Sequence, residues 1–346
     1  MKKMIAGMIA VCITAFMFLS LSADAKEVKY MCVYGDSIPA GYGLSKQSQN
    51  FANMLSGEYG LTKGIDFLNY SVSGATSGEI LRKISATNDK VLQKADTVII
   101  SAGGNDIMNV YGLKLIKSAE KYRYELESAG IELNGNNPVS MIGQIAGLFL
   151  YPDKAEIILR IFEDCMTESA QADYQKAVDD FGKNMREMVE HIKNTGSQAD
   201  IYFFALYDPV SVFAIDTDFF NSLDESIEAM REDVLFLAES DNQFHAVDVF
   251  GHFKGHYAEW TNIYKFDIHP NKEGHEQLYQ ITDKAIKATA VEIRESSDEI
   301  SEDIFESSFE TEIPQNHDYI VWIIVGGIVL IAVVGAVIIA IVKNSE

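Results

Sequence analysis

Short apolar runs alternate with longer amphipathic stretches along most of this chain of 346 residues. The short runs predict strands, and they cover residues 28–34, 66–70, 97–102, 200–206 and 244–247. Between them, apolar residues recur every three or four positions, which predicts helices, chiefly at 51–59, 77–86, 174–194, 222–239 and 272–295. This alternation is typical of βαβ units on a parallel, doubly wound sheet. In such a sheet, reactive groups collect beyond the carboxyl ends of the strands.

One connection in this pattern is too long for an ordinary loop between a strand and a helix. Residues 109–173 separate the third predicted strand from its helix and have an apolar periodicity of their own, at Ile142, Ile145, Leu148 and Phe149. We interpret this segment as a helical insertion. Because it follows the end of a strand, it could form a lid over a site. An insertion that packs aside, away from any substrate, fits the pattern equally well.

The first 25 residues have the pattern of a secretory signal peptide. Two lysines precede an apolar run at 4–21, and the small-x-small sequence at 23–25 fits cleavage by signal peptidase. We therefore expect the mature chain to begin at Lys26. A lipoprotein signal that ends at Cys12 is less favoured, because the apolar run continues well past that residue.

An uninterrupted apolar run of 24 residues, 319–342, lies near the other end of the chain. As a helix it would measure about 36 Å, enough to span a bilayer core of about 30 Å with some tilt. A buried helix of a soluble domain would not need to be apolar on every face. We expect one transmembrane helix, with the N-terminal domain outside the cell and residues 343–346 as a cytoplasmic tail.

The chain is strongly acidic, with 28 Lys and Arg against 51 Asp and Glu and a net charge of −23. Loss of the signal peptide would change this charge only to −24, because it removes two lysines and one aspartate. Nucleic acids and anionic lipids bind through clustered Lys and Arg, so we expect neither as a partner. Residues 296–318 are acidic, rich in serine and free of Lys and Arg. We interpret them as a solvated linker between the domain and the membrane.

Cys32 and Cys165 are the two cysteines that would remain in the mature chain. Cys32 lies within the first predicted strand, so we expect a buried free thiol. A disulfide between the two cysteines stays open, because a single pair has no diagnostic spacing. A domain at 26–295 is long enough to bury a core without such a link.

Two short blocks at the ends of the first two predicted strands hold candidate reactive groups. Ser37, in Gly35-Asp36-Ser37-Ile38, follows the first strand, and Gly35 would allow a tight turn that leaves the Ser37 hydroxyl exposed as a nucleophile. On its own, this sequence also fits an ordinary turn or a helix cap. Gly74 follows the second strand, where the backbone N–H of a glycine can approach a substrate oxygen closely, although a plain loop glycine would be favoured if Gly74 stood alone.

Two further blocks supply an amide and an imidazole. Asn105 follows a glycine pair at the end of the third predicted strand, where its amide could donate to an oxyanion. His269 precedes a predicted helix on a rigid loop, and an imidazole is the natural base near neutral pH. Taken singly, a histidine is more often structural, which is how we interpret His275. His252 and His256 resemble a metal pair only faintly, because no carboxylate or cysteine stands at a suitable spacing.

The order of the four blocks, their positions at strand ends and their chemistry together resemble the SGNH (GDSL) hydrolase family, over about residues 28–295. The resemblance implies a three-layer α/β/α, flavodoxin-like parallel sheet of five strands. It also implies that Ser37 is the nucleophile and His269 the base. The oxyanion hole would consist of the Ser37 N–H, the Gly74 N–H and the Asn105 amide.

The chain departs from the family's pattern at two positions. Ile38 stands where leucine is usual, which is an exchange between aliphatic residues. The family commonly has its triad aspartate three residues before the histidine, and Phe266 occupies that position here. Either Asp267 or the backbone carbonyl of Phe266 could accept the Nδ1 proton of His269. We favour Asp267, because a charge also stabilises the imidazolium that forms during attack.

The resemblance implies a serine ester hydrolase of the GDSL esterase/lipase type that acts through an acyl-enzyme intermediate, without a metal or organic cofactor. With the two end segments, it would be extracellular and anchored in the cell membrane. Its substrates would be lipids, short acyl esters, thioesters or acetylated glycans. Four aromatic residues of the insertion would suit an acyl chain or a sugar ring: Tyr111, Tyr122, Tyr124 and Phe149. Two alternatives stay open, a non-catalytic surface binding module and a metal-dependent phosphoester hydrolase.

Overall fold

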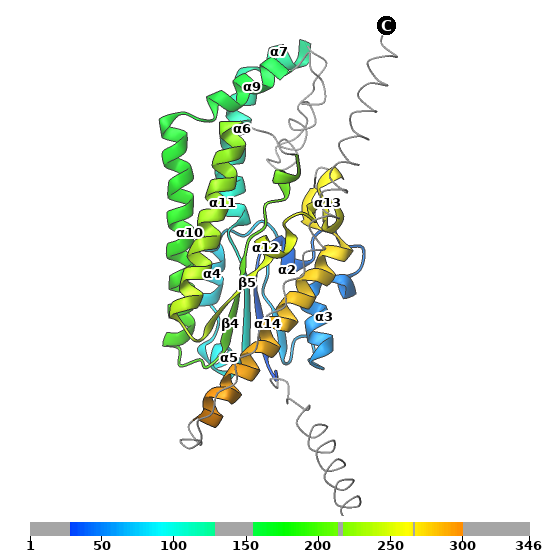
Figure 1. Cartoon of the computed structure of the whole chain (residues 1–346), viewed down its shortest axis with the longest axis vertical. Coiled ribbons are helices and arrows are strands. Elements are labelled where there is room, and N and C mark those ends of the chain that lie inside the picture. Colours follow the sequence, from blue (N-terminus) through cyan, green and yellow to red (C-terminus); the bar gives the residue numbers. More distant parts are fainter. Residues whose placement is uncertain (1–27, 129–154, 214–216, 266, 300–346) are drawn as a thin grey trace, which may run out of the picture. The chain divides into compact units, whose positions relative to one another are not determined.

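The computed structural model of the protein describes residues 28–128, 155–213, 217–265 and 267–299 (Figure 1). The predicted signal peptide, the predicted transmembrane helix, Phe266 and the insertion residues 129–154 lie outside this part of the chain, and so does most of the predicted linker. Among the residues that the structure does describe, none of the helices combines the length and the apolar character needed to cross a bilayer.

Five parallel strands form the central sheet, in the order β2-β1-β3-β4-β5. The strands are β1 (Met31–Gly35), β2 (Phe67–Asn69), β3 (Thr97–Ser101), β4 (Asp200–Ala205) and β5 (Phe244–Asp248). This is the flavodoxin-like, doubly wound order, so the predicted parallel sheet is confirmed. β1 begins later than its apolar run, because the N–H groups of Lys29 and Tyr30 each donate to the Asp96 carboxylate at 2.8 Å.

Helices cover both faces of this sheet (Figure 1). In β1, Cys32 and Tyr34 face one helical layer, whereas Met31 and Val33 face the other. The first layer contains α4 (Ser77–Ser85), α5 (Asp89–Lys94), α6 (Gly104–Lys121), α10 (Glu168–Asn194) and α11 (Asp218–Ser240). The second contains α3 (Phe51–Glu58) and α14 (Lys272–Glu299). Burial on both faces explains why the strands are apolar along almost their whole length.

The two cysteines are separate, buried thiols. Cys32 lies in β1 and Cys165 lies among the helices of the first layer. Burial raises the pKa of each thiol to about 12. Both therefore stay protonated at neutral pH and behave as small apolar core residues.

The predicted helices are present, and two of them begin earlier than their apolar pattern indicates. α10 begins after Thr167 and α11 after Thr217, and the hydroxyl of each threonine accepts a backbone N–H of the first turn. These first turns are too polar to show an apolar period, but a threonine cap supports them. α6 starts within the third sequence block and enters the segment 109–173, while α10 crosses the other end of that segment.

α6, α10 and α11 continue beyond the sheet, where α7 (Arg123–Ser128) and α9 (Ala155–Asp164) join them (Figure 1). The ring of Tyr111 on α6 stacks on that of Tyr174 on α10, with 3.7 Å between centroids. The Tyr111 hydroxyl donates to the Ser222 carbonyl of α11 at 2.7 Å. Phe162 of α9 stacks on Phe219 of α11 at 4.9 Å. This aromatic packing fixes α6 and α11 relative to each other beyond the carboxyl edge of the sheet.

The remaining elements are short. They are α2 (Ser37–Ala40), α12 (Val249–Phe253), α13 (Tyr257–Trp260), β6 (Thr261–Asn262), β7 (Asp267–Pro270) and the 3₁₀ turns η1 (Gln47–Gln49), η3 (Pro209–Phe213) and η4 (Ile263–Lys265). β6 and β7 pair as a small antiparallel sheet. The sequence indicates only a loop before the last helix, whereas in the structure this loop is strand β7, which carries His269.

Candidate active site

Ser37 is the first residue of α2, directly beyond the end of β1. Asp36 caps this turn, because its Oδ1 accepts the Ile38 N–H at 3.0 Å. Gly35 is required by close packing: a Cβ at this position would lie 2.8 Å from the carbonyl oxygen of Ser101 on β3. A tight turn therefore follows β1 and holds Ser37 at the carboxyl edge of the sheet. The expected exposure of its hydroxyl is wrong, because only 8% of Ser37 is exposed and the residue lines a cavity.

Two side-chain amides hold α2 in place. Asn50 and Asn69 both donate to the Pro39 carbonyl, at 2.9 and 2.8 Å. The Oδ1 atom of Asn69 also accepts the Ser71 N–H at 3.0 Å, which ties α2 to the loop that leads to Gly74. Sequence reasoning missed both residues. Asn50 precedes a predicted helix and Asn69 lies near the end of a predicted strand, and neither position indicates that they share an acceptor.

β7 places His269 against Ser37. The distance from His269 Nε2 to Ser37 Oγ is 2.8 Å, and that from His269 Nδ1 to Asp267 Oδ1 is 2.5 Å. A carboxylate can only accept, so Nδ1 carries the proton, and Nε2 of the neutral ring accepts from the serine hydroxyl. The three side chains form the hydrogen-bonded chain that activates a serine for attack.

The side chain of Asp267 contacts the imidazole, although it stands only two residues before His269. Its Oδ1 also accepts the backbone N–H of His269 at 3.0 Å. Burial alone would raise the pKa of Asp267, but the hydrogen bonds and the charge of His269, together with Lys265, hold that pKa below its ordinary value. Asp267 is therefore ionised at neutral pH, in the form that stabilises an imidazolium.

Contacts from other elements fix β7. Tyr207, which follows β4, donates its hydroxyl to the Ile268 carbonyl at 2.7 Å. Asn271, just before α14, donates to the Thr261 carbonyl of β6 at 3.1 Å and accepts the Gly274 N–H at 2.9 Å. The backbone is thus held by hydrogen bonds before and after His269, and these fix the position of the imidazole.

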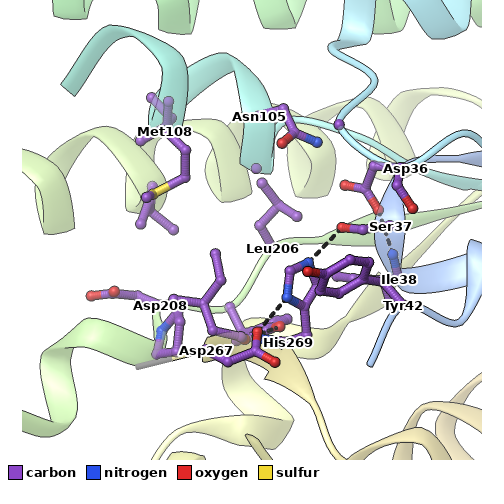
Figure 2. Close-up of a pocket in the computed structure, with 18 of the residues that line it drawn as sticks. Asp36, Ser37, Ile38, Tyr42, Asn105, Met108, Leu206, Asp208, Asp267 and His269 are labelled. Atoms are coloured by element: carbon purple, nitrogen blue, oxygen red, sulfur yellow. Dashed lines mark hydrogen bonds and ion pairs between the residues drawn. The ribbon is translucent and has the colours of Figure 1, made fainter. Parts of the chain in front are cut away.

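Tyr42 lies against the imidazole of His269, with 4.4 Å between the ring centroids (Figure 2). The residue stands between Gly41 and Gly43, whose φ angles of +76° and +78° lie in the left-handed region that glycine favours. About half of Tyr42 is exposed, at 52%. Its ring therefore covers the imidazole at the mouth of the site. Nothing in the local sequence indicates this contact, because it joins residues that are far apart in the chain.

Gly74 and Asn105 meet Ser37 at a single cavity of about 510 Å³ (Figure 2). Gly74 has a φ of +85°, and no atom lies within 4 Å of the position that a side chain would occupy. Asn105 is the second residue of α6, and its amide donates to the Ala75 carbonyl at 3.0 Å. This bond orients the amide and leaves its second hydrogen for another acceptor. The structure brings together every predicted site residue: Ser37, Gly74, Asn105, Asp267 and His269.

The cavity extends from Ser37 to the seam between two helices. Its apolar lining comes from α6, α11, the end of β4 and β7: Ile107, Met108, Leu206, Leu223, Ile227 and Ile268. Sequence reasoning missed these residues, because the same apolar periodicity also describes ordinary core positions. One wall of the cavity is therefore built from the helices that project beyond the sheet.

The tyrosines expected to contact substrate do not line this cavity. Tyr111 is fully buried between α6, α10 and α11. Tyr122 packs under the guanidinium of Arg160 at 4.9 Å, and Tyr124 is 82% exposed. The expectation is wrong for these three residues, because Tyr111 joins helices to one another and the other two lie on α7 or just before it. Phe149 falls outside the described residues.

Three other histidines have structural surroundings. Burial, with a contribution from nearby His269, lowers the pKa of His275 to about 4, so this ring is neutral at physiological pH. His252 and His256 each stack on Trp260, at centroid distances of 5.1 and 4.2 Å. Within the described ranges, no three His, Cys, Asp or Glu side chains are grouped as metal ligands would be.

Asp36 is a buried acid beside Ser37, with only 3% of the residue exposed. Burial raises its pKa from an ordinary 3.8 to about 6, although the Ile38 N–H, the charge of His269 and the Ser101 hydroxyl all favour ionisation. At neutral pH Asp36 is therefore a buried carboxylate, and its charge makes the folded protein less stable than a neutral group would.

We expect Asp36→Asn to stabilise the protein at neutral pH. The unfolded chain loses this proton near pH 4 and the folded protein near pH 6, so ionisation of Asp36 lowers the stability as the pH rises through this interval. A difference of about two pH units corresponds to about 3 kcal/mol in the free energy of unfolding. The asparagine keeps the acceptor for the Ile38 N–H. It should raise the free energy of unfolding by as much as this amount at pH 8, but by little at pH 4.

Urea denaturation at pH 4 and pH 8 measures this effect, with the exposed Glu276→Gln as the control for loss of a negative charge. An equal gain at both pH values would contradict the assigned ionisation of Asp36.

A parallel sheet with a serine, a histidine and an aspartate joined at its carboxyl edge defines a hydrolase with a serine nucleophile. A sequence model of the GDSL-like Lipase/Acylhydrolase family matches residues 33–277, and the chain belongs to this family. It is therefore an ester-hydrolysing serine hydrolase, as the resemblance in the four blocks implies. No curated protein matches the sequence.

Several solved structures are similar to this chain. The lipase Lip_vut3 from a goat rumen metagenome has 18% identity and a TM-score of 0.47, and the match covers 75% of this chain and 96% of that one. TesA has 17% identity and a TM-score of 0.43, with 75% and 99% covered. The psychrotrophic esterase EstA from Pseudoalteromonas sp. has 16% identity and a TM-score of 0.42, with 75% and 97% covered.

Proposed function

We propose that this protein is an extracellular, membrane-anchored carboxylic ester hydrolase that acts through an acyl-enzyme intermediate on Ser37. The observation that supports it is the continuous chain from Ser37 Oγ to His269 Nε2 and from His269 Nδ1 to Asp267, at 2.8 and 2.5 Å. These three hydrogen-bonded side chains line the same cavity as Gly74 and Asn105. Nucleophile, base and oxyanion donors thus share one space of substrate size.

The proposed reaction proceeds in two steps. Ser37 Oγ attacks the ester carbonyl while His269 Nε2 takes its proton, and the oxyanion is held by the Ser37 N–H, the Gly74 N–H and the Asn105 amide. His269 then gives the proton to the leaving alcohol, which breaks the bond between the alcohol oxygen and the acyl carbon. Water attacks the acyl-enzyme in the same way and releases the acid. Asp267 stabilises the imidazolium in both steps.

Asn105→Ala should lower kcat by about 10²- to 10³-fold, which is the usual effect of removing one oxyanion donor. KM should change much less, because the amide acts mainly on the charge that develops in the transition state. Steady-state kinetics on a soluble ester would show this. Asn109→Ala, an exposed position on the same helix, serves as the control. A loss confined to KM would assign Asn105 to substrate binding only.

Labelling with a fluorophosphonate tests the nucleophile without requiring the natural substrate. The intact protein should be modified at Ser37, and Ser73→Ala, which changes another serine of the same cavity, should still be modified. Ser37→Ala should not react. Labelling that does not depend on Ser37 would overturn the proposal, and a non-catalytic binding module would stay unlabelled. Activity that disappears with a chelator would instead support a metal-dependent phosphoester hydrolase.

The proposed location rests on the two apolar segments of the sequence. The full chain should fractionate with membranes, and a fluorophosphonate that cannot cross the membrane should label it on intact cells. Deletion of residues 319–346 should release an active protein into the medium. Recovery of the full chain from the soluble fraction inside cells would contradict the proposed anchor and its orientation.

A further inference from the structure

We propose that the seam between α6 and α11 binds the acyl chain of the substrate, that the enzyme prefers medium-length apolar acyl groups over acetyl, and that Met108 limits the chain length. The inference rests on the proposed function of Ser37 as the acylated residue. It concerns which ester is cleaved, so it can fail while that function stands.

The chemistry sets the orientation of the ester in the cavity. His269 Nε2 must protonate the leaving alcohol, so the alcohol lies on the side of the imidazole, where the half-exposed Tyr42 opens to solvent. The acyl substituent lies on the opposite side of the carbonyl carbon. Figure 2 shows Met108 across the cavity from Ser37 and His269, and both ends belong to the same cavity.

The two helices lead away from the sheet edge side by side. Asn105 and Met108 are three residues apart on α6, so they share a face of the helix, and Met108 lies about 4.5 Å further along the axis from the sheet. On α11, Leu223 and Ile227 line the cavity at a spacing of four residues. An extended acyl chain attached to Ser37 would therefore pass the Asn105 amide and enter the seam between these side chains.

The walls of this seam are apolar, while most polar groups of the cavity stand at the Ser37 end. Ile107 and Leu223 are almost fully buried at 2% and 1% exposed, and Ile227 is 7% exposed. A sugar ring would need hydrogen-bonding partners around it, and the described residues that line the seam do not offer a ring of such groups. An acetyl group would leave the seam unfilled, whereas a longer chain would displace water from apolar surface.

Met108 is the residue suited to limit the chain. It is half-buried, and its unbranched side chain is more adaptable than the branched residues beside it. Asp208 also lines the cavity, but its side chain points away from Ser37 (Figure 2), and only 2% of the residue is exposed. The apolar wall, rather than this carboxylate, would therefore set the preference for the acyl group.

The test is a series of p-nitrophenyl esters from acetyl to palmitoyl, with the full chain in detergent. From acetyl to at least hexanoyl, kcat/KM should rise by up to about 4-fold per methylene group, and it should fall before palmitoyl. Met108→Ala should move the optimum to longer chains and Met108→Trp to shorter ones. Leu113→Ala, an exposed position on the same helix, should leave the profile unchanged. Thermal unfolding confirms that each variant is folded.

Three results would overturn the inference. The first is a preference for acetyl, and the second is an optimum that stays fixed in both Met108 variants. The third is faster cleavage of an ω-aminohexanoyl ester than of the hexanoyl ester. This result would show that the Asp208 carboxylate binds the end of the acyl group. Fluorophosphonate labelling of Ser37 in the same samples separates these results from failure of the proposed function, in which Ser37 stays unlabelled.

Discussion

Ser37→Ala should lower kcat by about 10⁴- to 10⁶-fold, the loss found when the nucleophile of a serine triad is removed. Alanine cannot form the acyl-enzyme, so His269 and Asp267 have no group to activate. The fold should be unaffected, because the side chain loses only its hydroxyl at the first position of a short helix. Hydrolysis of the octanoyl ester, with the active enzyme titrated by a fluorophosphonate, measures the loss.

Ser73→Ala is the matched control for Ser37→Ala, because it removes a second serine hydroxyl from the same cavity. Its kcat should stay within a few-fold of the unmodified protein. If Ser37→Ala kept most of its activity, the nucleophile would be another group, and the bond between Ser37 and His269 would be structural.

The sheet could be predicted from sequence because its three inner strands, β1, β3 and β4, are buried on both faces. Val98, Ile99 and Ile100 in β3 are all fully buried, so an apolar run is visible without a partner strand. The first turns of α10 and α11 could not be predicted in the same way, since polar residues and a threonine cap define them. β7 could not be predicted either, because β6 is only two residues long and its partners in β7, Asp267 and Pro270, show no apolar alternation.

The grouping of the candidate site residues could be predicted because parallel strands bring their carboxyl ends to one edge. Ser37, Gly74 and Asn105 each follow a different strand, so the topology alone places them together. The contacts that support these residues could not be predicted in this way. Tyr42 meets His269, and Asn69 meets Pro39, through tertiary packing that no local pattern encodes.

The role of the tyrosines in the insertion could not be predicted from the sequence. An aromatic residue near a site is compatible with substrate binding and with core packing. Tyr111 could be assigned only once Tyr174, Phe219 and Ser222 were seen around it. Aliphatic residues of α6 and α11 line the cavity instead, and their period is indistinguishable from that of a core helix.

Asp267→Asn should lower kcat by about 10³- to 10⁴-fold, because an amide can present its N–H to the imidazole and favour the tautomer in which Nε2 cannot accept the serine proton. The short contact between Asp267 Oδ1 and His269 Nδ1, at 2.5 Å, is the observation behind this expectation. The asparagine also lacks the charge that stabilises the imidazolium. Steady-state kinetics on the octanoyl ester measure the effect, and KM should change little.

Asp36→Asn is the matched control for Asp267→Asn, since it removes the other carboxylate charge beside His269 without touching the Nδ1 atom. If both substitutions lowered kcat equally, the field of the two charges would matter more than the hydrogen bond to Nδ1. If Asp267→Asn left kcat almost unchanged, a backbone carbonyl such as that of Phe266 would orient the ring. A large loss in Asp267→Asn alone assigns the orientation of the imidazole to a carboxylate two residues before the histidine.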